Sequence, residues 1–256
     1  MRRARVFIGG LLLFSWLSQA EASDFDHSLL DRILNAYVDP QGLVDYNGIA
    51  QDARFARYVQ SLNTADLQKL PSDAQLAFWI NAYNVVMIDK VLKKKPKESV
   101  LETFIPKLWI STRIFKTREH EVVGREVSLE DIEHGILRKQ FKEPRIHFAI
   151  VCASMGCPPL SRIAYTEQNV QALLHEQTLK YIQSPRGSRI DREKNRLYLS
   201  NIFSWFEEDF VEKAGSVDSF ISSYLDEEGL SFLKERKPQI EFLDYDWSLN
   251  AKEPIR

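Results

Sequence analysis

The stretch AQLAFWINAYNVVMIDKVL, residues 74–92, is apolar on nearly all sides when it is read as a helix. A helix on a protein surface carries its apolar residues on one stripe, so a helix that is apolar all round is expected at the centre of a fold. The Pro-Ser-Asp sequence at residues 71–73 is typical of a helix start, and the run at residues 93–96, which ends in proline, closes the helix. The sequence therefore predicts a buried central helix.

The segments on both sides of this helix alternate between helical and extended patterns. Helices are predicted over residues 25–38, 52–62, 128–137, 166–184, 202–211, 217–224 and 226–234. Strands are predicted over residues 108–115, 121–127, 144–152 and 240–247, with a β-hairpin over 189–199. No repeat or flexible linker interrupts the chain. The predicted class is α+β: a helix-rich single domain whose central buried helix packs on a small, mostly antiparallel sheet.

The first 22 residues carry the pattern of a secretory signal peptide. Three arginines precede an apolar run at residues 6–17, and Ala20-Glu21-Ala22 supplies a small-x-small cleavage pattern. The run is too short to cross a bilayer comfortably, although a retained N-terminal anchor is the alternative interpretation. We therefore expect cleavage near Ala22, one globular domain over residues 23–256, and a periplasmic or secreted location.

Composition narrows the expected partners. The chain has 34 basic and 36 acidic residues and a formal net charge of −2, which argues against nucleic acid as the main partner. No segment after the signal pattern is apolar enough to span a membrane, so no transmembrane segment is expected in the mature chain. P-loop, dinucleotide-binding and HExxH motifs are missing, and we expect no cofactor and no metal. The expected partner is an unknown substrate or a component of the cell envelope.

The richest chemical constellation is RIHFAIVCASMGCPP, residues 145–159. His147 and Cys152 lie five residues apart, and an ideal strand would point them to opposite faces. Cys157 follows the turn at Gly156, so the alternation of side chains along the strand does not determine where it points. It is therefore the better partner for His147. A nearby imidazole lowers the pKa of a thiol and yields a thiolate nucleophile. The alternatives are a Cys152–Cys157 disulfide, favoured by an oxidising compartment, or two inert buried thiols.

Other polar residues lie within apolar segments. Asn81 and Asn84 share one face of the central helix, where they cap neighbouring loops or orient a catalytic group. Glu133 and His134 offer a general base beside an acid, or a structural pair. Carboxylates in the aromatic stretches 204–210 and 244–250 could pair with arginine or orient a histidine. A zinc site from the two histidines and the two cysteines, His134, His147, Cys152 and Cys157, is a further hypothesis, although the spacings match no standard ligand pattern.

Five motifs in order resemble the DUF547 family (domain of unknown function 547). They are FWINAYN (78–84), IEHGILR (132–138), RIHFA through CPPL (145–160), WFEEDF (205–210) and YDW (245–247). The resemblance covers almost the whole mature chain and implies an exported bacterial member. The order of histidine before cysteine is similar to that of circularly permuted papain-like or transglutaminase-like thiol enzymes.

Two functional hypotheses follow from these residues. The first is a thiol-dependent hydrolase or acyltransferase that acts on a peptide or amide bond in the cell envelope. Its nucleophile is Cys157, its base is His147 and its orienting amide is Asn81 or Asn84. The second is a non-catalytic binding or assembly module in which a Cys152–Cys157 disulfide is structural.

Overall fold

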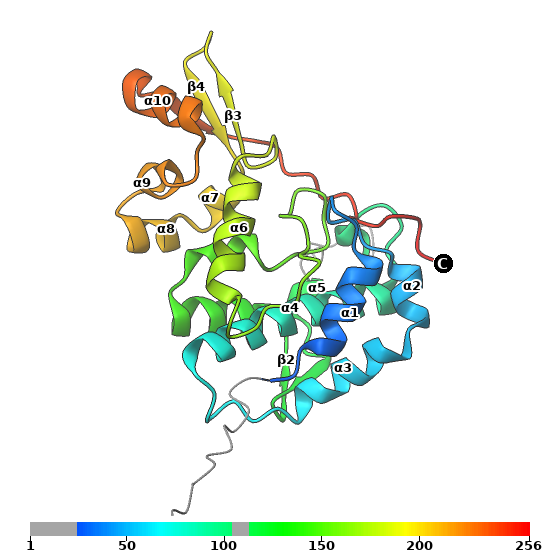
Figure 1. The fold of residues 1–256 in the computed structure, drawn as a ribbon. Helices are drawn as coiled ribbons and strands as arrows, with labels where there is room; N and C mark the ends of the chain where they lie inside the picture. Colours follow the sequence, from blue (N-terminus) through cyan, green and yellow to red (C-terminus); the bar gives the residue numbers. More distant parts are fainter. Residues whose placement is uncertain (1–24, 104–112) are drawn as a thin grey trace, which may run out of the picture.

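The computed structural model describes residues 25–103 and 113–256 (Figure 1). The predicted signal peptide, residues 1–22, lies outside the described residues, as do the first five residues of the strand predicted over 108–115. The remainder of that segment is helical, because α5 spans Arg113–Lys116. The strand prediction is therefore wrong for residues 113–115.

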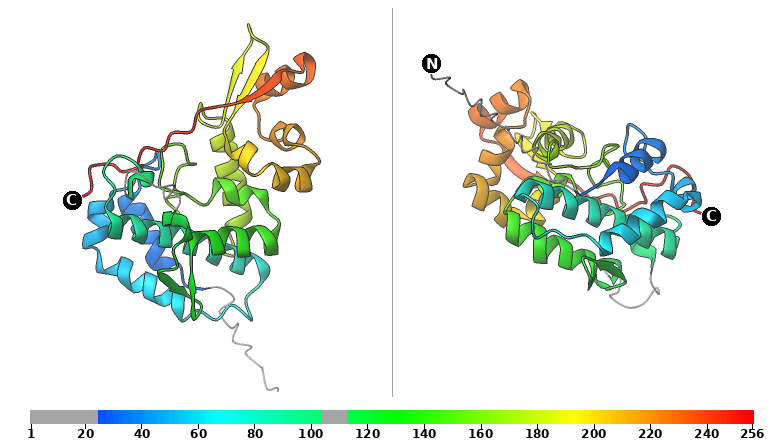
Figure 2. Two further views of the ribbon diagram at one scale, coloured as in Figure 1. Left: turned by 180° about the vertical axis from the view of Figure 1, so that it is seen from behind. Right: turned by 60° about the horizontal axis from the view of Figure 1, so that its bottom comes forward.

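The central helix is α4 (Ser72–Lys94), and every residue from 76 to 88 is buried. It packs against α2 (Tyr46–Gln51), α3 (Ala53–Asn63), α6 (Val170–Ile182) and the π-type helix η2 (Asp131–Phe141). Figure 2 shows these helices around it from two further sides. The predicted buried helix is confirmed.

Helices α2 and α3 pack on α4, and α1 (Ser28–Tyr37) packs on α2 and α3. Helix α1 buries Leu30, Ile33 and Leu34. The side chain of Asp45 caps α2 and that of Asp52 caps α3, because each accepts a hydrogen bond from a backbone N–H in the first turn. A short 3₁₀ turn, η1 (Val100–Thr103), follows α4.

Two small sheets complete the α+β fold. The antiparallel hairpin of β1 (His120–Val122) and β2 (Arg125–Val127) packs against α3. In the other sheet, β4 (Arg196–Leu199) lies between β3 (Ser188–Asp191), to which it is antiparallel, and β5 (Gln239–Phe242), to which it is parallel. A helix of 23 residues extends about 35 Å, whereas four residues of strand extend about 13 Å. The strands are too short to cover the central helix, and other helices cover it instead. The β3–β4 hairpin projects from one end of the molecule (Figure 1).

The predicted strand over residues 144–152 is wrong. Pro144–Phe148 form a 3₁₀ helix, η3, and the chain then continues as a loop. The side chain of Glu143 accepts a hydrogen bond from the N–H of Arg145 and starts this turn, with Pro144 in its first positions. The amide of Asn84 then bonds the Ala149 carbonyl and the Val151 N–H. Because the Asn84 side chain bonds these backbone groups, the apolar segment needs no neighbouring strand.

Short helices and a long tail form the C-terminal part. The helices are α7 (Ile202–Trp205), α8 (Glu207–Ala214), α9 (Val217–Ser222) and α10 (Glu227–Arg236). Strand β5 ends at Phe242, earlier than the predicted 247, and the chain then returns across the molecule. Isolated bridges pair this tail with distant segments: Val44 with Ala251, Ser99 with Ser248, and Ser154 with Leu249. The tail is the red segment in Figure 1.

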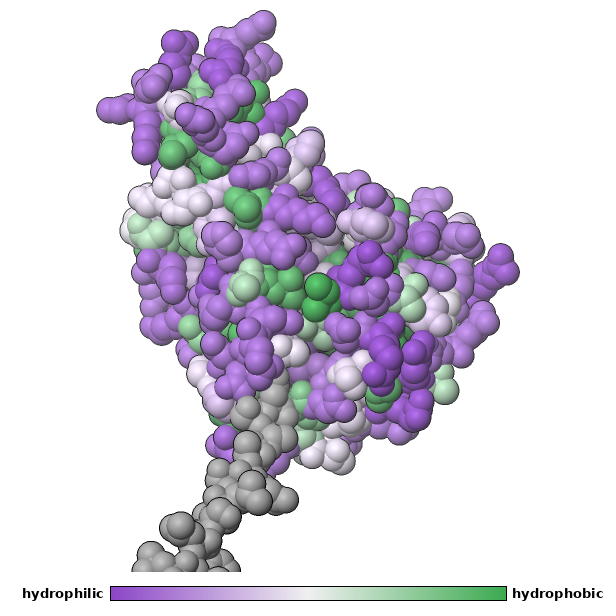
Figure 3. Space-filling view, in the orientation of Figure 1, coloured by the Kyte–Doolittle hydropathy of each residue, from purple (hydrophilic) through white to green (hydrophobic). Residues whose placement is uncertain are grey.

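The buried side chains form two hydrophobic clusters that meet at η3. The larger surrounds α4, and the smaller lies among α6, β4 and the helices α7 to α10. Ile146 of η3 belongs to the larger cluster and Phe148 to the smaller. The face in Figure 3 is mostly hydrophilic, with scattered hydrophobic residues. Within residues 25–103 and 113–256, no helix has both the length and the apolar character needed to cross a membrane.

Candidate active site

A pocket of about 180 Å³ lies where the two hydrophobic clusters meet. Its walls come from α4, η2, η3, the loop that holds both cysteines, α7 and the C-terminal tail. Most of the lining is aromatic or aliphatic. Its ionisable or redox-active side chains include Glu133, His147, Cys152 and Cys157. An apolar pocket with a few converging polar groups is typical of a small-molecule or substrate site.

His147 is held in one orientation by a carboxylate and an aromatic ring. Its Nε2 lies 2.7 Å from Oδ2 of Asp209, and its ring stacks on Phe206 at a centroid distance of 3.8 Å. Burial lowers the pKa of His147, although the hydrogen bond to Asp209 opposes that shift. A neutral imidazole that donates through Nε2 leaves Nδ1 without a proton. This Nδ1 has no hydrogen-bond partner among the described residues.

Arg138 anchors Asp209 from the other side. Its Nε and Nη2 donate to the two carboxylate oxygens at 2.6 and 2.8 Å, and its Nη1 donates to Nδ1 of His134 at 3.0 Å. Burial alone would raise the pKa of Asp209, but the hydrogen bonds from His147 and Arg138 outweigh it and hold that pKa below its ordinary value. His134 thus positions the guanidinium. Burial and the same guanidinium lower the pKa of His134.

Glu133 presents a second titratable group to the pocket. Its Oε1 lies 3.8 Å from Nδ1 of His147, and the hydroxyl of Tyr83 donates to its Oε2 at 3.4 Å. Burial raises the pKa of Glu133 to about 7, and the positive charge of Arg138 only partly opposes this shift. Near neutral pH the group can therefore act as a proton donor or acceptor.

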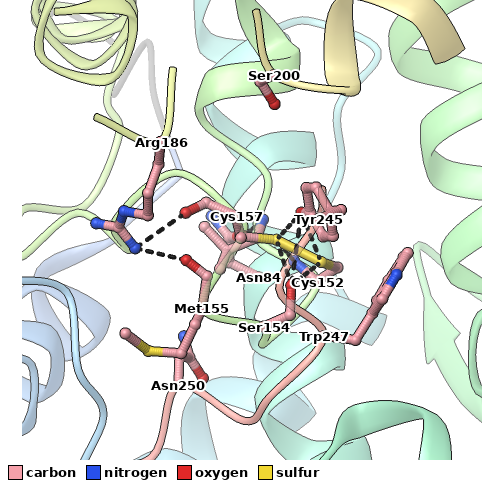
Figure 4. The surroundings of a disulfide bond; sticks show 12 residues. Asn84, Cys152, Ser154, Met155, Cys157, Arg186, Ser200, Tyr245, Trp247 and Asn250 are labelled. Carbon is pink, nitrogen blue, oxygen red and sulfur yellow. Dashed lines mark hydrogen bonds between the residues drawn. A yellow bond between two sulfur atoms is a disulfide. The ribbon is translucent and has the colours of Figure 1, made fainter. Parts of the chain in front are cut away.

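The two cysteines form a disulfide bond in this structure, so neither is a free thiol. Cys157 is buried, while Cys152 is half-buried and faces the pocket. The sulfur of Cys157 accepts hydrogen bonds from the backbone N–H of Cys152 at 2.9 Å and the hydroxyl of Tyr245 at 3.2 Å. Figure 4 shows Tyr245 and Ser154 beside the two sulfurs. Of the predicted alternatives, the disulfide is the state that the structure contains.

The C-terminal tail delivers Tyr245 to this disulfide. The N–H of Gly156 donates to the Asp246 carbonyl at 2.7 Å, and the N–H of Met155 donates to the Ser248 carbonyl at 2.7 Å. A Cβ at position 156 would lie 2.9 Å from both the Tyr245 ring and the Asp246 carbonyl oxygen. Glycine is therefore required for the tail to approach the cysteine loop.

The predicted amides have roles away from the imidazole. Asn81 bonds the backbone of Tyr165 through both its side-chain atoms, and Asn84 bonds the backbone of residues 149–151. Both fit the interpretation that they cap neighbouring loops, and the residue that orients His147 is Asp209. Asp209 lies in the predicted aromatic-acidic stretch 204–210, where one carboxylate was expected to orient a histidine. Nothing in the local sequence of Tyr245 points to the sulfur that it contacts.

The structure does not assemble the hypothetical zinc site. Two of its four proposed ligands, Cys152 and Cys157, are joined to each other. In the part of the chain that the structure describes, no group of three or more His, Cys, Asp or Glu residues is arranged to hold a metal ion.

Comparison with protein families agrees with the sequence motifs. Residues 67–182 match the family model described as "Protein of unknown function, DUF547". This region of the chain is therefore a DUF547 region, and the predicted resemblance is confirmed. It contains α4, η2, η3, the cysteine loop and α6, whereas Asp209 and Tyr245 lie beyond it. No curated protein and no solved structure matches the chain.

The raised pKa of Glu133 predicts a specific pH dependence of stability. The folded protein keeps this proton up to about pH 7, whereas the unfolded chain releases it near pH 4.5, so the free energy of unfolding falls between these values. The loss should approach about 3 kcal/mol at 1.36 kcal/mol per pKa unit. In Glu133→Gln the group no longer titrates. The stability of this variant relative to wild type should therefore rise by about that amount from pH 4.5 to pH 7.

Urea unfolding of both proteins at a series of pH values measures this difference. Glu235→Gln is the matched control, because Glu235 is an exposed residue of α10 outside the pocket. Its stability relative to wild type should stay nearly constant. A Glu133→Gln curve parallel to that of wild type would contradict the assignment.

Proposed function

We propose that the protein is a thiol-dependent hydrolase or acyltransferase that acts on a peptide or amide bond at this pocket. One observation carries the proposal: a single pocket is lined both by a cysteine pair and by a histidine that a carboxylate holds. Cysteine, histidine and a carboxylate or amide are the groups that thiol hydrolases combine. The disulfide makes this the oxidised, resting form of the enzyme.

The nucleophile in the proposed reaction is the thiolate of Cys157, released when the disulfide is reduced. The thiolate attacks the carbonyl carbon of the substrate and forms a tetrahedral intermediate. Protonated His147 gives its proton to the departing amine, and a thioester remains on Cys157. Neutral His147 then takes a proton from water or from an acceptor amine, which attacks the thioester and releases the acyl group.

The electrostatics around His147 favour the neutral imidazole that a general base requires. Asp209 stabilises the imidazolium form, while burial and the positive charge of Arg138 favour the neutral form. Because these influences oppose each other, the ring can gain and lose a proton during one cycle. Glu133 lies beside the free Nδ1 and supplies a second site for proton exchange.

A second candidate function rests on the disulfide itself. If the Cys152–Cys157 bond is permanent, the pocket contains no nucleophilic thiol. The protein would then be a binding or assembly module, in which the aromatic residues Trp205, Tyr245 and Trp247 line the pocket. Acylation of the reduced protein separates the two functions.

Acylation with p-nitrophenyl acetate, a generic acyl donor, tests the enzymatic proposal. We expect the reduced full chain to acquire one acetyl group on Cys157 and release p-nitrophenolate in a burst. His147→Gln should slow this acylation at least about 100-fold, because the imidazole is the base that takes the proton of the Cys157 thiol. Rapid kinetics and peptide mapping by mass spectrometry give the rate and the site.

The matched control is His175→Gln, because His175 is an exposed histidine in α6 outside the pocket. It should acylate at the wild-type rate. Equal rates for wild type and His147→Gln, or acetylation spread over lysines with none on Cys157, would leave the binding module as the function.

We also propose that the protein works in the cell envelope or outside the cell. The signal pattern that ends at Ala22 supports this location. In a bacterial host with a periplasm, the full chain should yield a periplasmic protein whose N-terminal residue is Ser23. Ala22→Phe should slow processing, because the signal peptidase needs a small residue there. A cytoplasmic protein that keeps its first 22 residues would refute the proposal.

A further inference from the structure

We propose that the Cys152–Cys157 disulfide is a thiol-exchange site with a fixed polarity. An external dithiol attacks the sulfur of Cys152, and Cys157 leaves as the thiolate. This inference rests on the proposed function, in which the Cys157 thiolate is the nucleophile. It adds how that thiolate is released and names a dithiol as the chemical class of the partner that releases it.

The two sulfurs differ in accessibility. The residue Cys157 is 3% exposed, and its sulfur lies under the ring hydroxyl of Tyr245. Both residues line the pocket, but Cys152 is half-buried and therefore the more exposed of the two, so an incoming thiolate can reach its sulfur more easily from the pocket side. Since exchange needs attack on one sulfur in line with the departure of the other, access favours attack at Cys152.

The two sulfurs also differ in their hydrogen-bond donors. The backbone N–H of Cys152 points to Cys157 Sγ at 2.9 Å, and this donor has no alternative sulfur partner. The Tyr245 hydroxyl lies 3.2 Å from Cys157 Sγ and 3.5 Å from Cys152 Sγ, so it is closer to the leaving sulfur. The Ser154 hydroxyl lies 3.1 Å from Cys152 Sγ and 3.6 Å from Cys157 Sγ and can turn towards the charge that develops. Donors stabilise a thiolate more than a neutral sulfur, so Cys157 is the better leaving group.

The reaction balances with a dithiol as reductant. The first thiolate of the partner forms a mixed disulfide with Cys152 as the Cys152–Cys157 bond breaks, and Cys157 keeps the electron pair. The second thiolate of the partner attacks the partner sulfur of that mixed disulfide and releases Cys152. The partner is oxidised to a disulfide, and this protein gains two electrons and takes up protons from solvent as pH requires.

The cysteine loop is held by bonds that do not involve sulfur. The N–H groups of Met155 and Gly156 bond the tail, the Asn250 N–H bonds the Ala153 carbonyl, and Arg186 donates to the Met155 carbonyl at 2.6 Å. Figure 4 shows Arg186 beside the loop, away from Tyr245. Reduction therefore leaves the loop and the Tyr245 hydroxyl in place, as a reversible exchange site requires.

Trapping the mixed disulfide tests the polarity. The oxidised full chain is incubated with glutathione as the probe thiol, quenched with N-ethylmaleimide and mapped by mass spectrometry without reduction. We expect glutathione on Cys152 and maleimide on Cys157 in at least about ten-fold excess over the reverse pattern. The reverse pattern, or a disulfide that opens only when the protein is unfolded by urea, would overturn the inference.

Removal of the tyrosine hydroxyl tests the donor role. Tyr245→Phe should slow opening by dithiothreitol about ten-fold and shift the pH profile of Cys157 alkylation in the reduced protein upward by about one unit. Ser154→Ala should shift both in the same direction by less, and Tyr198→Phe, which changes a tyrosine outside the pocket, should shift neither. Unchanged rates and profiles in both Tyr245→Phe and Ser154→Ala would overturn the donor role.

These tests separate the two proposals. If the disulfide opens with the predicted polarity but p-nitrophenyl acetate does not acylate the reduced protein, the result supports thiol exchange and contradicts the hydrolase. If the native disulfide resists dithiothreitol, but the protein is acylated after chemical reduction by other means, the result supports the hydrolase and contradicts thiol exchange.

Discussion

The hydrogen bond between His147 and Asp209 joins the two hydrophobic clusters of this protein at the pocket. His147 comes from η3, which lies at the edge of the core around α4, and Asp209 comes from α8 in the smaller cluster. If α8 were displaced, the imidazole would lose its carboxylate partner, and Phe206, which begins that helix, would no longer stack on it. The site therefore depends on packing between the DUF547 region and a C-terminal part that lies beyond residue 182.

The half-buried guanidinium of Arg138 influences the charges beside the pocket. Arg138 makes its close contacts with Asp209, and this pair keeps a negative charge beside His147 without forcing the imidazole to stay protonated. The charge of Arg138 lowers the pKa of Glu133 only in part. Burial has the larger effect on that pKa, and the carboxyl keeps its proton to about pH 7. The pKa values of the two carboxyl groups beside His147 are thus shifted in opposite directions, which is how acid and base roles are divided in many active sites.

Patterns among neighbouring residues predicted local structure, whereas contacts between residues far apart in the sequence could not be predicted from them. The apolar run of α4 and the helix start at residues 71–73 both appear in the structure, since each depends on residues close together in the sequence. The strand predicted over residues 144–152 failed because an amide from α4, some 65 residues earlier, satisfies its backbone. Tyr245 reaches Cys157 across 88 positions, and no pattern in one sequence reports such a contact. The structure brings the candidates Glu133, His147, Cys152 and Cys157 to one pocket. Asp209 and Tyr245, which contact this group, were not singled out by the sequence.

Asp209 holds His147 as the Nε2–H tautomer and leaves an unprotonated Nδ1 beside Glu133. Nitrogen-15 NMR of the imidazole, with His147 assigned by comparison with His147→Gln, reads the protonation of each ring nitrogen directly. At pH 7 the account predicts a neutral ring with its proton on Nε2, and a mixture of tautomers in Asp209→Asn. A doubly protonated ring, or a proton on Nδ1 in the wild-type protein, would contradict it.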